Sequence, residues 1–392
     1  RALEVDPTNG RAWLQLAQIQ NADDPQRAVE LMLKGASLAK DPEDRMHLFF
    51  LLGTHMHDHK VWEMSYHAFR EALRVGEEHG LDTLLAACQT LFLAHYLAEW
   101  DFLDELMPPT LANLTTSLKL GESPALHPWM TICVPMEPSL RLRVAQHFVL
   151  ALRIKYITPE ANGGHGLDEY PVQLTHDQGA LSYFGEPYRA TGPPQKPIRR
   201  LKVGFVSADF KQKATAYLCV SNFKHFDRSK FELYAYATTT DSPENPSVWR
   251  QQLRAQVDYF RELHDEDMSP KQASMIVAWD KVDILIDLDG YSNEGLRRSE
   301  LFSVRHAPLT MAWFVYMSTV GNPHVDYIVG DPVVCPDDVA ANMSGKVLHL
   351  PLSFFPNSQA DLFPLDQPLF GVDPQLDKPR ASMGLPERHF DE

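Results

Sequence analysis

Cysteine is scarce in this sequence, and its four cysteines are far apart. No two of them form a Cys-x-x-Cys pair. Four widely separated thiols in a long chain do not make a disulfide framework. We therefore expect buried free thiols in a reducing compartment, either cytoplasmic or nuclear, at Cys88, Cys133, Cys219 and Cys335.

Basic residues are outnumbered. The chain has 36 Lys and Arg against 52 Asp and Glu, which gives a net charge of −16. Nucleic-acid binding needs clustered positive charge, so a nucleic-acid partner is not expected. No apolar run approaches the roughly 20 residues that span a bilayer, so no membrane partner is expected either.

Several nucleotide and hydrolase motifs are also missing. No Walker A sequence and no Gly-x-Gly-x-x-Gly follows the first predicted strand, and no Gly-x-Ser-x-Gly elbow occurs. NTPases, simple dehydrogenases and α/β-hydrolases are therefore poor fits. The chain has no initiator Met, and its last stretch, "MGLPERHFDE", stops at the start of a new element. We expect a fragment of a longer protein.

What the sequence does contain is, first, a helical pattern over residues 1–156. Trp13, Leu16, Ala17 and Gln20 follow helical spacing after a turn with Pro7 and Asn9. The pairs Asp6-Pro7 and Asp41-Pro42 lie 35 residues apart, close to the tetratricopeptide period of roughly 34. Small residues suited to close helix packing follow at Ala28, Ala36, Ala68 and Ala72. The pattern favours a tetratricopeptide-like solenoid, with a plain helical bundle as the alternative.

Three histidines alternate in "THMHDHK", at positions 55, 57 and 59. Neutral imidazoles can bind zinc or copper, but alternate positions on a helix point to different faces. No cysteine nearby completes a site, so we predict an exposed turn between helices and no metal.

Residues 157–200 are rich in Pro and Gly and lack periodicity, as in "TGPPQKPIRR", which predicts a linker. From Leu201 onward, apolar strands alternate with helical segments. This alternation predicts a Rossmann-like α/β domain with a mostly parallel sheet that helices cover on both faces. The expected strands are "LKVGFVS", "FELYAYATT", "VDYFREL", "VDILIDLDGY", "PLTMAWFVY", "VDYIVGD" and "GKVLHLP", with helices at "PSVWRQQLRAQ" and "SPKQASMIVAWDK", the latter capped by Ser269 before Pro270.

Polar residues gather where these strands end. In parallel sheets, sites lie at the carboxyl ends of the strands. The ends carry Ser207–Asp209, Asp287–Tyr291, Ser318–Gly321 and Asp331. The alternative is that Asp209 and Asp289 only cap helices or tighten turns, as strand-end aspartates often do.

At this point the chain resembles the protein O-GlcNAc transferases. The ordered landmarks are "LKVGFVSADF", "FELYAYA", "VDILIDLDGYS", "ELFSVRHAPLTMAW", "VDYIVGD" and "GKVLHLPLSFFP"; "LAEWDFLDELM" and "HPWMTICVP" resemble the helical segments that precede them. The resemblance implies that residues 201–375 are the amino-terminal Rossmann-like half of the catalytic region. Residues 376–392 would begin a truncated carboxy-terminal half.

The resemblance also implies an activity. The family moves GlcNAc from UDP-GlcNAc to Ser or Thr of proteins recruited by the repeats, and needs no cofactor beyond this donor. The nucleotide site belongs to the carboxy-terminal half, so these 392 residues alone are expected to be inactive. Two alternatives stay open: a protein O-fucosyltransferase, as in a related plant branch, and a non-catalytic repeat scaffold with a degenerate transferase domain.

The pocket residues match the family only in part. Its first loop usually reads Asp-Phe-Gly-Asn-His-Pro-Thr-Ser-His; here Asp209 and Thr215 match, while Lys213 and Tyr217 stand at the histidine positions. A further family histidine, on the third strand, falls on Tyr259. In the family's Gly-Tyr-Pro-Gly-Thr-x-Gly loop, the sequence retains Tyr316, Thr319 and Gly321 and replaces the other positions with Val315, Met317 and Ser318.

These replacements bear on chemistry. Lysine has an ordinary pKa of about 10.4 and is a poor base at neutral pH. The catalytic residue is therefore left unassigned. Asp209, Thr215, Tyr316, Thr319 and Gly321 are the expected substrate-binding residues.

Overall fold

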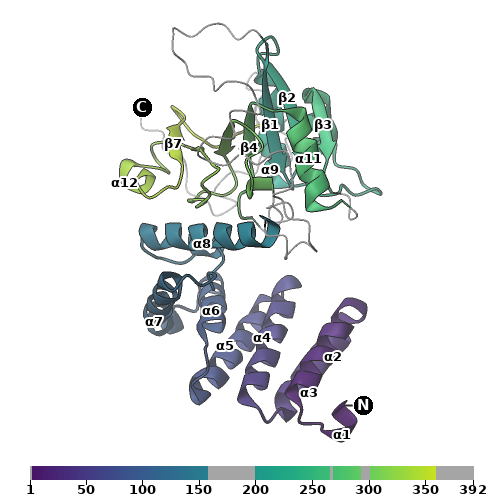
Figure 1. Ribbon diagram of the computed structural model, residues 1–392, viewed down its shortest axis with the longest axis vertical. Helices are drawn as coiled ribbons and strands as arrows, with labels where there is room; N and C mark the ends of the chain where they lie inside the picture. The colour runs from purple at the N-terminus through teal and green to yellow at the C-terminus, as the bar shows by residue number, and fades with distance from the viewer. Residues whose placement is uncertain (1, 158–198, 265–267, 293–300, 359–392) are drawn as a thin grey trace, which may run out of the picture.

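The computed structural model describes residues 2–157, 199–264, 268–292 and 301–358 (Figure 1). The predicted linker, apart from its ends, and the predicted start of a carboxy-terminal half lie outside these residues. In Figure 1 the amino-terminal helices form the lower part of the molecule and a sheet with its helices forms the upper part.

The lower part is an array in which successive helices pack against each other. Its members are α1 (Ala2–Val5), α2 (Gly10–Asp23), α3 (Pro25–Leu38), α4 (Pro42–Asp58), α5 (Trp62–His79), α6 (Leu84–Tyr96), α7 (Trp100–Lys119) and α8 (Pro138–Ile157). The alanines singled out from the sequence are buried, as close helix packing requires: Ala28, Ala36, Ala68 and Ala72. The predicted helical-repeat fold is confirmed.

Side-chain caps set where the helices begin. Asn9, Asp24 and Asp41 each accept a backbone N–H in the first turn of α2, α3 and α4. The two Asp-Pro pairs are not equivalent, however. Asp41 caps α4, whereas Asp6 binds the Thr8 hydroxyl at 2.7 Å within a turn before α2. The helix starts therefore follow the caps rather than the Asp-Pro spacing.

Two expectations for the array need correction. His59 is exposed at the end of α4, but His55 is buried within that helix, so an exposed turn was wrong for His55. Its ring lies 4.3 Å from that of His59, one turn away. The stretch "HPWMTICVP" forms turns around a single 3-10 turn, η1 (Met130–Ile132), instead of a longer helix.

The upper part contains a parallel sheet of seven strands in the order β3-β2-β1-β4-β5-β6-β7. The strands are β1 (Leu201–Ser207), β2 (Phe231–Ala237), β3 (Tyr259–Glu262), β4 (Ile284–Asp287), β5 (Leu309–Ala312), β6 (Tyr327–Gly330) and β7 (Lys346–His349). All seven predicted strands are present. β1 has the predicted bounds, and the other six are shorter than the predicted stretches because flanking residues turn away into loops.

Helices cover both faces of the sheet around β1 and β2. Phe205 and Leu233 pack with α9 (Ala214–Cys219), η4 (Val220–His225) and α10 (Val248–Gln256) on one face. Tyr236 packs with α11 (Pro270–Asp280) on the other. Ser269 caps α11, as predicted, and does so in a reciprocal capping box. Ser247 caps α10. A single turn of helix, α12 (Asp337–Ala340), precedes β7.

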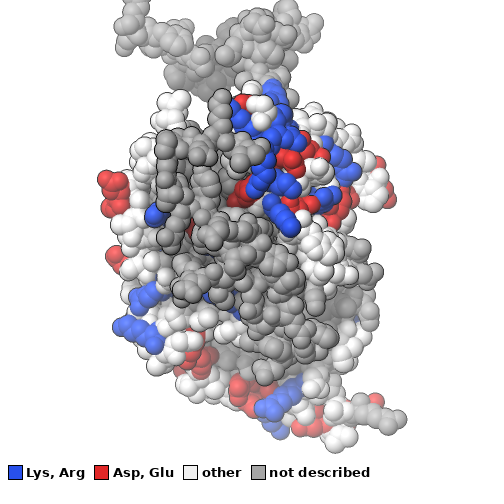
Figure 2. All heavy atoms as spheres, turned by 45° about the horizontal axis from the view of Figure 1, so that its top comes forward, with Lys and Arg blue, Asp and Glu red and all other residues white. Residues whose placement is uncertain are grey.

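The two ends of the sheet differ in character. The amino ends carry a network of ion pairs that includes Arg199–Asp283, Arg200–Glu232 and Arg228–Asp258. In Figure 2 Lys and Arg side chains are interspersed with Asp and Glu in the upper part of the visible face. The carboxyl ends face α8, which lies between the sheet and the rest of the array in Figure 1. Polar groups of the loops gather at this second end.

The cysteines largely follow expectation. Cys88, Cys219 and Cys335 are buried free thiols, but Cys133 is exposed, in the turns after η1. Expecting burial there was wrong because the segment is not a packed helix. None of the described helices combines the length and apolar character that crossing a membrane requires.

Candidate functional site at the carboxyl ends of the strands

The loop after β1 is built from a short chain of hydrogen bonds. The Asp209 backbone N–H donates to the Ser207 hydroxyl at 2.9 Å, which fixes the turn. The Thr215 hydroxyl, in the first turn of α9, donates to the Asp209 carboxylate at 2.7 Å. Asp209 and Thr215, both predicted to bind substrate, are thus brought together. Their contact closes the loop on itself.

The end of β4 supplies two aspartates on the other side of this loop. Asp289 accepts the Ser207 hydroxyl at 2.7 Å and the Ala208 backbone N–H, so it ties the β4 end to the β1 end. Asp287 accepts the backbone N–H groups of Asp289 and Gly290 at 3.1 and 3.0 Å. Asp287 thus tightens the turn after β4, and Asp289 holds the turn after β1, which for Asp289 is the structural alternative considered above.

Burial changes the acidity of both carboxylates. Burial raises the pKa of Asp287 to about 6, against the opposing effect of the two N–H groups that it accepts. Burial and then the neighbouring Asp287 carboxylate raise the pKa of Asp289 well above its ordinary value. Shifted carboxylates of this kind often lie at functional sites, although structural turns also produce them.

The end of β5 turns sharply. Phe314 has a φ of 97°, which is unusual for a residue with a side chain, and its ring lies 5.1 Å from that of Phe355. Such conformations persist only where the surroundings impose them, and they concentrate at functional sites. Val315, at a glycine position of the family loop, packs its side chain toward the hydrophobic core below β1.

The retained residues of that loop contact the helical array. Tyr316 is buried, and its hydroxyl donates to the Pro128 carbonyl at 3.2 Å, just before η1. Gly321 has a φ of 64°, and a Cβ there would lie 2.4 Å from the backbone carbon of Ala145 in α8. Thr319 is buried and accepts the Ser344 backbone N–H at 2.9 Å. Tyr316 and Gly321 thus hold the loop against the helical array, and Thr319 ties it to the turn before β7.

Asp331, at the end of β6, also serves the backbone. Its carboxylate accepts the N–H groups of Val333, Val334 and Phe354 at 2.8, 3.0 and 3.0 Å. These donors hold the pKa of Asp331 below its ordinary value. The side chain shapes the loop beyond β6.

Two of the three positions that hold histidine in the resembled family lie close together, and the third lies apart. Lys213 is the residue before α9, beside the first loop. Tyr217 is one turn further along and partly exposed, with its ring 6.0 Å from that of Trp249. Tyr259 begins β3 and stacks on Tyr234 at 4.6 Å, level with the middle of β2. Only Lys213 and Tyr217 thus belong to the strand-end region.

Comparison with known proteins relates the sequence of this region to a family. Residues 181–368 match the model of glycosyl transferase family 41. We call this stretch the family 41 segment, after the model that it matches. It contains every strand of the sheet together with the loops described above, which agrees with the resemblance found in the sequence.

The relatives of this family 41 segment are named as transferases. The chain is 26% identical over 291 residues to the probable UDP-N-acetylglucosamine–peptide N-acetylglucosaminyltransferase SEC of Arabidopsis thaliana, covering 74% of this chain and 26% of that protein. It is 33% identical over 164 residues to a Caenorhabditis elegans UDP-N-acetylglucosamine–peptide N-acetylglucosaminyltransferase, covering 42% and 14%. An O-GlcNAc transferase mutant structure from Thermobaculum terrenum aligns at 20% identity and a TM-score of 0.48, over 90% of this chain and 53% of that one. The chain thus spans about a quarter of the length of the Arabidopsis relative.

One feature of the family 41 segment was not found in the sequence. Arg250 of α10 is buried, and its guanidinium donates to the carbonyls of Phe210 and Thr239 at 2.9 and 3.2 Å. It also pairs with Glu262 at the end of β3. Arg250 therefore links the first loop to the ends of β2 and β3. Its helical position alone did not indicate burial.

Proposed function

We propose that this chain is part of a protein O-linked glycosyltransferase that moves GlcNAc from UDP-GlcNAc to Ser or Thr of proteins. The observation that carries the proposal is the family 41 match over the segment that forms the parallel sheet. The curated relatives, by name, use the same donor and peptide acceptors. Because the chain covers only part of these relatives, the activity is proposed for the natural full-length protein, in the cytoplasm or nucleus.

The strand-end loops would serve the acceptor side of this reaction. A Ser or Thr hydroxyl must be aimed at the anomeric carbon, and its proton must be accepted as the bond forms. The Asp209–Thr215 contact holds the first loop in one conformation. A lysine ammonium donates rather than accepts a proton, so Lys213 is better suited to stabilising negative charge on the departing diphosphate than to acting as a base.

The helical array would recruit the protein substrate. Residues of α2 and α4 line a groove of about 520 Å³, which is within the range of pockets that bind small ligands. Its lining side chains include Arg11, Leu14, Gln18, His47 and Phe50. Helical-repeat solenoids commonly bind extended partners on such surfaces. α8 and the Tyr316 loop connect this array to the strand ends.

A second candidate is a non-catalytic scaffold that keeps the fold without turnover. It is favoured by Lys213 and Tyr217 at histidine positions of the resembled family, and by Tyr259, which stacks away from the strand-end loops. Under this alternative the repeats still bind proteins, and the sheet supports them.

The deciding experiment measures transfer of azide-tagged GlcNAc from its UDP donor to acceptor proteins by the natural full-length protein. We expect transfer, and we expect Lys213→Ala to reduce its rate by about 10²-fold, since one lost stabilising donor has a cost of this order. Turnover that appears only after Lys213→His would support the scaffold instead.

A further inference from the structure

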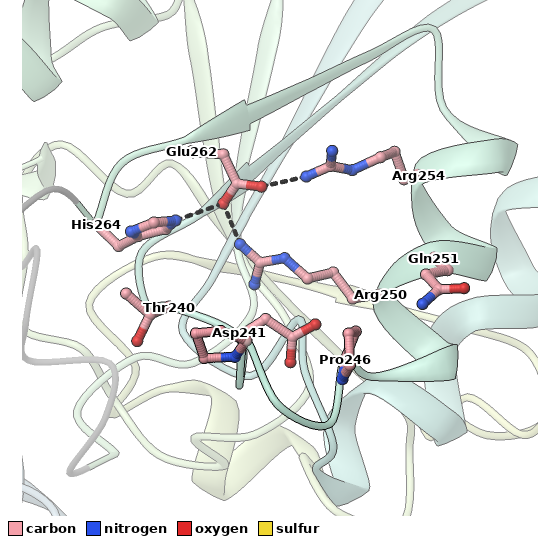
Figure 3. A pocket seen from close by; sticks show the side chains of 9 residues that line it. Thr240, Asp241, Pro246, Arg250, Gln251, Arg254, Glu262 and His264 are labelled. Atoms are coloured by element: carbon pink, nitrogen blue, oxygen red, sulfur yellow. Dashed lines mark hydrogen bonds and ion pairs between the residues drawn. The ribbon is translucent and has the colours of Figure 1, made fainter.

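A second pocket lies beside the strand-end site, at the carboxyl ends of β2 and β3 (Figure 3). It has a volume of about 560 Å³, which is within the range of pockets that bind small ligands or short peptide segments. Nine residues line it: Thr240, Asp241, Pro243, Pro246, Arg250, Gln251, Arg254, Glu262 and His264.

The base of this pocket is a fixed cluster of charges. The Glu262 carboxylate accepts from Arg250, Arg254 and His264, the last at 2.7 Å (Figure 3). Arg250 is buried and is held from behind by the Phe210 and Thr239 carbonyls. Three donors on one carboxylate leave the cluster rigid. The base is therefore formed before any ligand arrives.

The mouth of the pocket offers both donors and acceptors. Arg254 uses one guanidinium nitrogen on Glu262, which leaves further N–H groups on an exposed side chain. In the neutral ring, His264 donates through Nε2 and so carries a lone pair at Nδ1. Among the described residues, the Gln251 amide and the Thr240 hydroxyl have no hydrogen-bond partner. Proline rings of Pro243 and Pro246 add apolar surface.

The formal charges of the lining residues balance. The positive charges of Arg250 and Arg254 are offset by the carboxylates of Glu262 and Asp241. Both oxygens of Asp241 already accept backbone N–H groups, from Ser242 and Ser247. A pocket of this kind does not concentrate an anion or a cation. It suits an uncharged ligand that carries donors and acceptors in turn, and the amides of an extended polypeptide have that pattern.

We propose that this pocket binds an extended, uncharged segment of the acceptor polypeptide, beside the residue that is glycosylated. The inference rests on the proposed function for its choice of a polypeptide. Arg250 connects the pocket directly to the first loop, through the Phe210 carbonyl next to Asp209. A chain that delivers a hydroxyl to that loop passes this pocket within a few residues, since an extended chain advances about 3.3 Å per residue.

The test uses the whole 392-residue chain and a fluorescein-labelled, end-capped decapeptide of Ala, Ser and Thr, without donor. Binding is followed by fluorescence anisotropy. Gln251→Ala removes a pocket amide, whereas Gln252→Ala, an exposed neighbour on α10 outside the lining, is the matched control. We expect Gln251→Ala to weaken binding about fivefold to tenfold, as lost hydrogen bonds do, and Gln252→Ala to leave it unchanged.

Two further measurements test the pocket and the class of ligand that it binds. Thr240→Trp places a large side chain at the pocket mouth and should abolish binding, with thermal melting showing that the fold is kept. Equal affinities for the Gln251 and Gln252 variants would overturn the proposal. So would a tenfold preference for the same peptide with Asp or Lys at its ends, or competition by free GlcNAc.

Failure here is separable from failure of the proposed function. Pocket-dependent peptide binding without any transfer by the full-length protein would support the peptide site and contradict the proposed enzyme activity. Transfer with an unchanged KM for the acceptor in Gln251→Ala would support the enzyme activity and contradict the peptide site.

Discussion

At the scale of single residues, the ionisation of Asp287 should change the free energy of unfolding of the fold. Its pKa is raised to about 6 in the folded chain, from an ordinary value of 3.8. Between these values the folded state binds more protons than the unfolded state. The contribution of Asp287 to the free energy of unfolding therefore falls as pH rises from about 4 to 6, and levels off above.

We expect Asp287→Asn to remove this dependence. The amide oxygen can still accept the two backbone N–H groups, but it carries no charge to desolvate. The variant should gain stability over the wild type as pH rises from 4 to 6, by at most about 3 kcal/mol, the equivalent of the pKa shift. Urea unfolding at several pH values measures this difference, with the exposed Asp338→Asn as control. A difference that is constant with pH would contradict the assignment.

The sequence predicted where the site residues lie better than it predicted their contacts. The sequence placed Asp209 and Asp289 near each other, because parallel strands bring their carboxyl ends to one edge, and the resemblance added Thr215. It could not show that Asp209 binds Thr215, or that Asp289 reaches across to Ser207, since these contacts depend on loop backbone. Arg250 was missed for the same reason, as its partners come from three separate segments.

At the scale of elements, the strands and the Ser269 cap could be predicted from the sequence. The packing between elements could not. Apolar runs and caps such as Ser269 are local signals, so β1 to β7 and α11 appear where expected. By resemblance, Tyr316 and Gly321 were expected to bind substrate, and that expectation stays a prediction. The structure shows that they contact η1 and α8, a relation between distant segments that no local pattern carries.

Gly321 makes this packing testable. Its φ of 64° and its approach to the Ala145 backbone both exclude a Cβ, so Gly321→Ala should destabilise the fold. Gly80 is a matched control, because it has a φ of 66° with nothing within 4 Å of an added Cβ. Gly80→Ala should cost about 1 kcal/mol from backbone strain alone, and Gly321→Ala at least about 2 kcal/mol more. If the two variants lose equal free energy of unfolding in urea, α8 does not pack closely against this loop.

At the scale of the whole molecule, α8 is the element that connects the array to the sheet. It belongs to the array by sequence, yet Val149 packs in one core cluster with Tyr291, Tyr316 and Val325 of the upper part. A shared core of this kind couples the stability of two parts, because neither can unfold without exposing apolar surface of the other. Under the proposed function, a substrate on the array would be presented to strand ends whose position is fixed.

The buried cysteines can report on this coupling. Cys88 lies in the core of the array and Cys219 in the core of the sheet, and burial raises the pKa of each thiol to about 12, so neither reacts in the folded chain. We expect both to become reactive over the same range of urea in the wild type, while exposed Cys133 reacts without urea and serves as reference. In Gly321→Ala the two transitions should separate by about 1 M, since a coupling of about 2 kcal/mol divided by a typical urea slope gives that shift. Mass spectrometry of alkylated peptides measures each thiol separately. If Cys88 and Cys219 already react in separate ranges in the wild type, the array and the sheet unfold independently, and α8 holds them together without coupling their stability.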